Sequence, residues 1–119
     1  MVFIGQKPIF LQIADYILTN ILTGVIAPNE RIPSVRDMAQ EIEVNPNTVA
    51  RAYSFLSDEG IIQNQRGIGY FVSKDALANT RRIRIKEFME EQLPQIFENM
   101  KILNISMEDI EKQYKLIVD

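Results

Sequence analysis

The chain has 119 residues, of which 46% are hydrophobic and 24% charged, a composition typical of one small globular domain with at most a short appendage. It contains no cysteine and no histidine, which excludes disulfides, thiolate or imidazole metal sites and Ser-His or cysteine nucleophiles. The uncharged stretches are too polar to span a membrane, and residues 1–7 lack the layout of a secretory signal. We therefore expect a cytoplasmic binding protein without a cofactor or metal, and not an enzyme.

The charge balance sets a condition on any nucleic-acid function. The formal net charge is −3, and neither the part up to Asp75 nor the part after it has an excess of basic residues. A protein that coats nucleic acid without regard to sequence is normally basic. DNA binding by this chain would therefore depend on a few well-placed basic side chains.

The first predicted helix extends from Pro8 to Gly24, because proline favours a helix start and glycine a helix end. Its apolar side chains repeat at helical spacing and form a broad stripe, which comprises Ile9, Ile13, Tyr16, Ile17 and Ile21, widened by Leu11, Leu18 and Leu22. Two prolines then exclude a helix over residues 28–33, which we expect to form a turn or a short extended piece.

Two capped helices separated by a very short turn follow. Ser34, with Asp37 three residues later, predicts the start of a helix that ends at about Glu43. Asn45 and Pro46 predict the cap and first position of the next helix, which Gly60 ends. One face of this second helix is apolar (Val49, Ala52, Tyr53, Leu56), and the opposite face carries Asn47, Ala50, Arg51, Ser54 and Asp58.

The spacing of the apolar residues then changes from that of a helix to that of a strand. Residues 61–65 and 70–73 predict two strands, and residues 66–69 between them, with two glycines, predict a hairpin tip. Residues 76–119 return to a helical pattern, in which Pro94 predicts a kink or two helices meeting at Leu93. Ser106 and Asp109 predict the start of a last short helix.

This order of elements is that of a winged helix-turn-helix followed by a helical tail, so the fold class is mainly α with a small β-hairpin. A short turn sets two helices at a steep angle, which allows the second to enter the major groove of DNA. A glycine-containing hairpin with one arginine can reach the adjacent backbone or minor groove. We expect a DNA-binding domain over residues 1–75 and a dimerisation tail over residues 76–119.

Three segments carry a family resemblance: PIFLQIADYI, RIPSVRDMAQEIEVNPNTVARAYSFLSDEGII and RGIGYFV. Together they closely resemble the N-terminal domain of the GntR family of bacterial transcriptional regulators, over about residues 8–73. The short helical tail resembles that of the YtrA-like subfamily of compact homodimeric repressors.

The resemblance implies a set of DNA-contacting residues. Arg36 matches an arginine that contacts phosphate or a base, and the start of the recognition helix and the wing tip supply the others, namely Asn47, Thr48, Arg66, Gly67 and Gly69. The chain departs from many members at Pro46, where a basic or hydroxyl residue is common, and at Ala50, where arginine is common. Arg51 is the single basic residue of that helix, and we assign it to DNA contact from its expected exposure as much as from the family pattern.

The apolar stripe of the tail predicts a homodimer, because two helices alone have no core of their own to pack against. The predicted interface comprises Phe88, Met89, Leu93, Phe97 and Met100. The basic cluster of residues 81–86 fits either a second phosphate contact or salt bridges to the glutamates that follow it, which otherwise form a solvated face. A small-molecule effector is not indicated.

Two functions from different classes remain for this fold. The first is a sequence-specific transcriptional regulator, a repressor that binds a dyad-symmetric operator in double-stranded DNA as a homodimer. The alternative is a winged-helix module for protein interaction without DNA binding, which the negative net charge would suit. A small enzyme fits the sequence poorly, because the glycines at residues 67 and 69 are not followed by a third glycine and a helix, as a dinucleotide-binding loop requires.

Overall fold

The computed structural model of the chain describes Met1 and residues 7–118. The chain divides into two compact units, residues 1–82 and residues 83–119. No helix in the described part of the chain is long and apolar enough to cross a bilayer.

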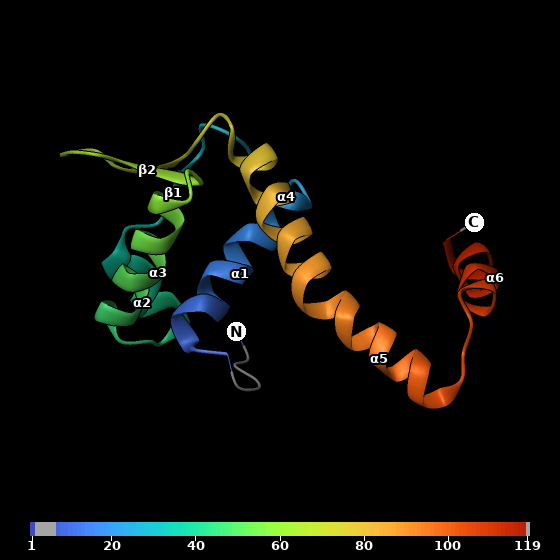
Figure 1. The fold of residues 1–119 in the computed structure, drawn as a ribbon. Helices are drawn as coiled ribbons and strands as arrows, with labels where there is room; N and C mark the ends of the chain where they lie inside the picture. The colour runs from blue at the N-terminus through green and yellow to red at the C-terminus, as the bar shows by residue number, and fades with distance from the viewer. Residues whose placement is uncertain (2–6, 119) are drawn as a thin grey trace. The chain divides into compact units, whose positions relative to one another are not determined.

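The first unit is a winged helix-turn-helix, which confirms the predicted fold class. Its helices are α1 (Ile9–Leu22), α2 (Val35–Ile42) and α3 (Pro46–Asp58), followed by a β-hairpin and the start of α4 (Ala76–Glu87). The strands β1 (Arg31–Ile32), β2 (Ile62–Gln65) and β3 (Gly69–Val72) form an antiparallel sheet in the order β1-β3-β2. The hairpin of β2 and β3 extends away from the helices (Figure 1).

The sheet has one strand more than the two predicted. Arg31 and Ile32, in the segment expected to be a turn or short extended piece, pair with Phe71 and Tyr70 of β3. Backbone hydrogen bonds from Asn29 to Val72 and from Val72 to Glu30, each 2.8 Å, continue this pairing beyond β1. The segment before α2 therefore forms the base of the wing.

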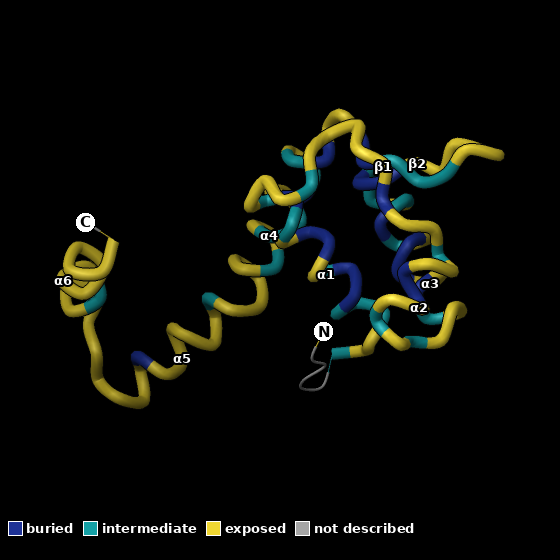
Figure 2. Tube along the Cα trace, turned by 180° about the vertical axis from the view of Figure 1, so that it is seen from behind, coloured by how far each residue is buried: buried dark blue, intermediate teal, exposed yellow. Residues whose placement is uncertain are grey.

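The core of the first unit lies between α1, α2 and α3. Buried residues recur along α1 and α3 (Figure 2), and β2 and β3 each contribute one. The residues at these positions are Ile13, Ala14, Ile17, Leu18, Ile21, Met38, Ala39, Val49, Ala52, Tyr53, Leu56, Ile62 and Val72. The stripe predicted for α1 was wrong at Ile9 and Tyr16, which are exposed because they lie more than a quarter-turn from the centre of the buried face.

The α2–turn–α3 segment agrees with the predicted signals. Ser34 Oγ accepts a hydrogen bond from the Asp37 backbone N–H at 3.1 Å, and α2 ends before Glu43, which adopts a left-handed conformation with φ of 57°. Asn45 Oδ1 accepts from the Asn47 N–H at 2.8 Å, and Pro46 occupies the first position of α3. Local hydrogen bonds and backbone conformations thus define both ends of α2 and the start of α3. The three-residue turn between the helices brings α2 and α3 into contact.

The second unit consists of the end of α4, a π-helical segment η1 (Phe88–Gln92), α5 (Leu93–Leu103) and α6 (Met107–Val118). Where a kink or two helices meeting at Leu93 was predicted, the backbone stays helical from α4 through η1 into α5, and the irregularity is the π-helical segment η1. Within the wide turn, the Leu93 N–H donates to the Phe88 carbonyl, five residues back. Pro94 explains this turn, because proline donates no hydrogen bond and its ring would clash with the carbonyl four residues earlier in a regular α-helix.

The predicted start of the last helix is also confirmed. Ser106 and Asp109 cap α6 reciprocally: Ser106 Oγ accepts from the Asp109 N–H, and Asp109 Oδ2 accepts from the Ser106 N–H, both at 3.1 Å. Before this cap, Asn104 ends α5 in a left-handed conformation with φ of 56°. The connection between α5 and α6 is therefore short and built from local hydrogen bonds.

Candidate nucleic-acid interface

The outer face of α3 is polar and exposed along its whole length. On the opposite face Val49, Ala52, Tyr53 and Leu56 are buried. The side chains that point outward are those predicted, namely Asn47, Ala50, Arg51, Ser54 and Asp58, and all five are exposed. This face can present amide, guanidinium and hydroxyl groups to a partner without any rearrangement of the core.

The first turn of α3 combines capping with exposure. Asn45 is occupied as the cap, since its side chain accepts from the Asn47 N–H and its carbonyl accepts from the N–H groups of Thr48 and Val49. The Asn47 side chain is exposed and the Thr48 side chain is half-buried. Asn47 is therefore the more accessible of the two polar residues predicted to contact DNA here.

Arg51 is exposed on the same face, and its guanidinium lies over an aromatic ring of another helix. The Arg51 Cζ is 4.1 Å from the centroid of the Phe10 ring, in the first turn of α1. This distance is typical of a cation–π interaction. The role of Phe10 was missed in the sequence, although Phe10 is at helical spacing from the buried residues Ala14, Ile17 and Ile21.

Arg36 is the second residue of α2 and is exposed. It shares the first turn of α2 with Asp37, whose N–H is capped by Ser34. The packing of α2 on α3 holds this turn within the same three-helix group as Asn47 and Arg51. The three side chains thus belong to one packed group of helices, as a helix-turn-helix requires.

The wing tip comprises Arg66, Gly67 and Ile68, all exposed, between β2 and β3. Gly67 has φ of 79° and Gly69 has φ of 147°, both in the region that disfavours residues with a Cβ. Arg66 is therefore presented at the end of the hairpin and not on the three-helix group.

The second residue that the sequence did not reveal is Arg31, which supports the wing from β1. Its Nη2 donates to the Ile68 carbonyl at 2.6 Å. A Cβ added at Gly69 would lie 2.9 Å from the Arg31 Nε, so the guanidinium fills the space that a side chain would need. No local signal could have found this contact, because the two residues joined by the hydrogen bond are 37 apart in the chain.

Tyr53 joins α3 to the other elements of the unit. Its hydroxyl donates to the Pro33 carbonyl at 2.7 Å, and its ring packs edge-on against Tyr70 of β3, with centroids 4.9 Å apart. Burial, together with the nearby Tyr70, Glu41 and Asp37, raises the pKa of the Tyr53 hydroxyl well above its ordinary value. The predicted core role of Tyr53 is confirmed, and its hydroxyl stays a donor at all physiological pH values.

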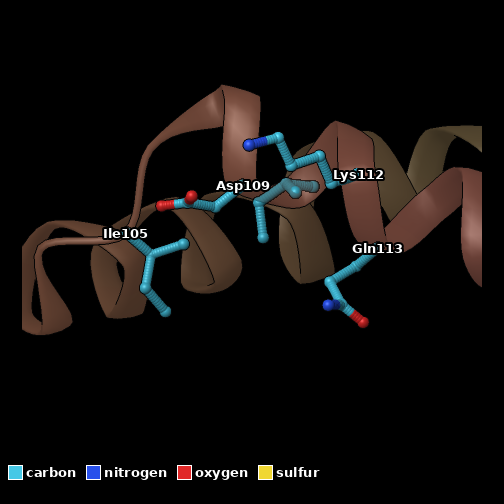
Figure 3. A pocket seen from close by; sticks show the side chains of 5 residues that line it. Ile105, Asp109, Lys112 and Gln113 are labelled. Carbon is cyan, nitrogen blue, oxygen red and sulfur yellow. The ribbon is translucent and has the colours of Figure 1, made fainter.

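The described residues contain no group of three or more Asp, Glu, His or Cys side chains arranged to hold a metal ion. A hollow of about 320 Å³ lies at the start of α6, bordered by Ile105, Asp109, Ile110, Lys112 and Gln113 (Figure 3). All of these except the half-buried Ile110 are exposed, so the hollow has no enclosed polar group to orient a ligand. It supplies no argument for an effector site.

The residues predicted to form an interface between two copies differ in exposure. Phe88 is 43% exposed, Met89 57% and Phe97 46%, and Leu93 is half-buried. Met100 is only 8% exposed in the single chain, so little of its surface remains for a partner. In the basic cluster of residues 81–86, the Arg82 Nη1 lies 4.0 Å from the Glu59 Oε2. At this separation the two side chains form at most a weak surface ion pair.

Comparison with known proteins identifies relatives over both parts of the chain. Residues 10–72 match the family described as bacterial regulatory proteins, gntR family. The chain is 43% identical over 74 residues to the HTH-type transcriptional regulator YhcF of Bacillus subtilis, a match that covers 62% of this chain and 61% of YhcF. It is 36% identical over 114 residues to the HTH-type transcriptional repressor YtrA of the same organism, which covers 95% of this chain and 86% of YtrA.

Solved structures of similar proteins include a whole-chain match and a DNA complex. A GntR family transcriptional regulator from Listeria monocytogenes is 33% identical, with a TM-score of 0.80 over 97% of this chain and 99% of that one. The DNA-binding domain of AraR, solved in complex with operator ORX1, is 27% identical, with a TM-score of 0.57 over 60% of this chain and 93% of that one. The family match spans α1, α2, α3 and the wing, the elements that form the interface described above, and this chain belongs to the GntR family of bacterial regulatory proteins.

Proposed function

We propose that this chain is a transcriptional repressor that acts in the cytoplasm by binding a dyad-symmetric operator in double-stranded DNA as a homodimer. The observation that carries the proposal is the outer face of α3, where Asn47, Arg51 and Ser54 are exposed directly opposite a fully buried apolar face. A helix of this kind, held by a short turn against α2, fits the major groove, where each base pair presents a distinct set of donors and acceptors.

The roles of the side chains follow from their positions. Arg51 is the candidate base reader, because an arginine can donate two hydrogen bonds to guanine from within the groove. Asn47 and Thr48, at the start of α3, supply shorter amide and hydroxyl groups. Arg36 in the first turn of α2 is the candidate phosphate contact. Each is a single group, which fits a chain whose net charge is −3 and which must bind by placement and not by bulk charge.

The wing contributes a separate contact. Arg66 with Gly67 and Gly69 forms a narrow tip, and an arginine at such a tip favours the negative potential of a narrow minor groove. The hydrogen bond from Arg31 to the Ile68 carbonyl ties the tip to β1. The wing therefore adds affinity that depends on groove width as well as on charge.

Exposed apolar residues of the tail support the homodimer. Phe88, Met89 and Phe97 are exposed, and the first two border a groove of about 520 Å³ whose other lining residues are Ile85, Arg84, Glu87 and Gln92. Contiguous apolar surface of this kind marks an interaction site. A two-fold dimer would present two copies of α3, and hence two half-sites related by dyad symmetry.

The test is DNA binding by the full chain as a function of salt. Fluorescence anisotropy should show tighter binding to a duplex taken from upstream of its own gene than to a scrambled duplex. The logarithm of affinity should fall linearly with the logarithm of salt concentration. A chain that binds neither duplex at low salt would instead support the protein-interaction module.

A further inference from the structure

We infer that Phe10 is a positioning residue for Arg51, so that the first turn of α1 takes part in reading DNA sequence; this inference rests on the proposed function. The observation is the stacking of the Arg51 guanidinium over the Phe10 ring, with 4.1 Å between the Arg51 Cζ and the ring centroid. The Arg51 side chain is exposed, and the Phe10 ring is half-buried.

The helix geometry explains why an aromatic ring stands there. Phe10 lies four, seven and eleven residues before Ala14, Ile17 and Ile21, and so belongs to the buried face of α1. The helices α1 and α3 pack on each other. At the first turn of α1, this face meets a residue of the outer face of α3. A ring at a core-type position therefore contacts a cation of the outer face.

The stacking leaves the hydrogen-bonding edge of the guanidinium available. A guanidinium is planar, so a ring covers one flat side while the N–H groups point outward in the plane. Within the described part of the chain, Arg51 makes no hydrogen bond or ion pair. The N–H groups that would pair with the acceptors of guanine are thus not used inside the protein.

The consequence for binding is preorganisation. A free arginine side chain has many rotamers and loses that freedom when it pairs with a base. Contact with the Phe10 ring restricts these rotamers before DNA arrives. Phe10 should therefore strengthen the operator complex, which needs one arginine geometry, more than a non-specific complex, which does not.

The experiment measures affinity for two duplexes with matched variants of the full chain. Wild-type protein first selects a duplex from a random-sequence pool, and a scrambled duplex of the same composition serves as the reference. Phe10→Leu should weaken binding to the selected duplex about two- to fivefold, the range of an exposed cation–π contact, and leave binding to the scrambled duplex unchanged. Phe10→Tyr keeps an aromatic ring and should bind both duplexes like the wild type.

Two further variants separate positioning from folding. Tyr16→Leu removes an exposed aromatic residue from another face of α1 and should change neither affinity. In an Arg51→Ala background, Phe10→Leu should have no further effect. If Phe10→Leu lowers the thermal midpoint, Phe10→Met provides the same comparison.

Two results would overturn the inference: equal weakening of both duplexes by Phe10→Leu, or an unchanged effect of Phe10→Leu in the Arg51→Ala background. A wild type that prefers the selected duplex, with a Phe10→Leu variant that keeps the full preference, rejects the inference and leaves the proposed function standing. A wild type that prefers no duplex over the scrambled one rejects the proposed function, and the inference with it.

Discussion

The Tyr53 hydroxyl donates a hydrogen bond to the Pro33 carbonyl over 2.7 Å, and this contact ties the middle of α3 to the residue before the cap of α2. The same ring touches Tyr70 of β3. A single buried side chain of α3 thus contacts both the entry to α2 and the wing, the two elements that must hold a fixed position relative to α3 for all three to meet one DNA site.

Removal of the Tyr53 hydroxyl should lower the stability of the protein without creating a cavity in the core. Tyr53→Phe keeps the ring and leaves the Pro33 carbonyl without its donor, so we expect a loss of about 1–2 kcal/mol in the free energy of unfolding. Urea denaturation followed by circular dichroism measures it. Tyr16→Phe, on the exposed side of α1, is the control and should change stability very little. Equal stability of Tyr53→Phe and the wild type would show that the hydrogen bond makes no net contribution to the free energy of unfolding.

The same hydroxyl predicts how stability depends on pH. Burial raises the pKa of Tyr53 in the folded state, so the folded protein keeps a proton that the unfolded chain loses above its ordinary pKa of about 10. Stability must therefore fall as pH rises above about 10, with a slope that approaches about 1.4 kcal/mol per pH unit from this group. Urea denaturation between pH 8 and 11 should show a constant difference between wild type and Tyr53→Phe below about pH 9, which narrows at higher pH. A difference that stays constant throughout would contradict this assignment.

Alanine substitutions of Arg51 and Arg36 should differ in how much they lower the preference for operator over random DNA. Arg51→Ala removes a base contact worth about 1–3 kcal/mol of discrimination and should weaken operator binding far more than binding to random DNA. Arg36→Ala removes a phosphate contact, so it should weaken both by similar factors and reduce the salt slope by about one unit. Anisotropy titrations at several salt concentrations measure both effects. The opposite pattern, with Arg36→Ala losing only operator binding, would exchange the two roles.

The two glycines of the wing offer a matched pair of substitutions. Gly69→Ala adds a Cβ that would lie 2.9 Å from the Arg31 Nε, at a φ of 147°, whereas Gly67→Ala adds one with no atom within 4 Å, at a φ of 79°. Each puts a side chain at positive φ, which costs about 1–3 kcal/mol; the cost is larger at 147°, far from the left-handed helical region, and only Gly69→Ala also displaces Arg31. Chemical denaturation should therefore show the larger loss for Gly69→Ala. Similar losses for the two variants would contradict both the greater strain and the Arg31 displacement expected at Gly69.

The homodimer can be tested in the full chain by placing charge on the exposed apolar side chains of the tail. A Phe88→Glu/Phe97→Glu double variant should sediment as a monomer at concentrations where the wild type is a dimer, because an unpaired carboxylate is costly to bury in an apolar interface. Val25→Glu, on an exposed apolar residue of the first unit, is the control and should leave the dimer intact. A double variant that still sediments as a dimer would place the interface elsewhere.

Local sequence signals determined the elements and one candidate functional surface. Serine, asparagine, proline and glycine act within a few residues of where they stand, so the ends of α2 and α3, the capped start of α6 and an irregularity in the helix next to Pro94 could all be predicted. Helical spacing likewise placed Asn47 and Arg51 opposite the buried face of α3. The family resemblance then predicted that this surface contacts DNA.

Tertiary structure alone decided the contacts that join distant segments. The pairing of β1 with β3, the support of the wing by Arg31 and the stacking of Arg51 on Phe10 each connect residues about forty apart, where no capping or periodic pattern acts. The same limit explains the exposure of Ile9 and Tyr16 and the burial of Met100, because a stripe of apolar residues does not reveal which of its edges a neighbour will cover. Tertiary packing determines which helix faces are buried where the sequence pattern does not distinguish them. In this protein it places an aromatic residue of α1 against the arginine of the candidate recognition helix.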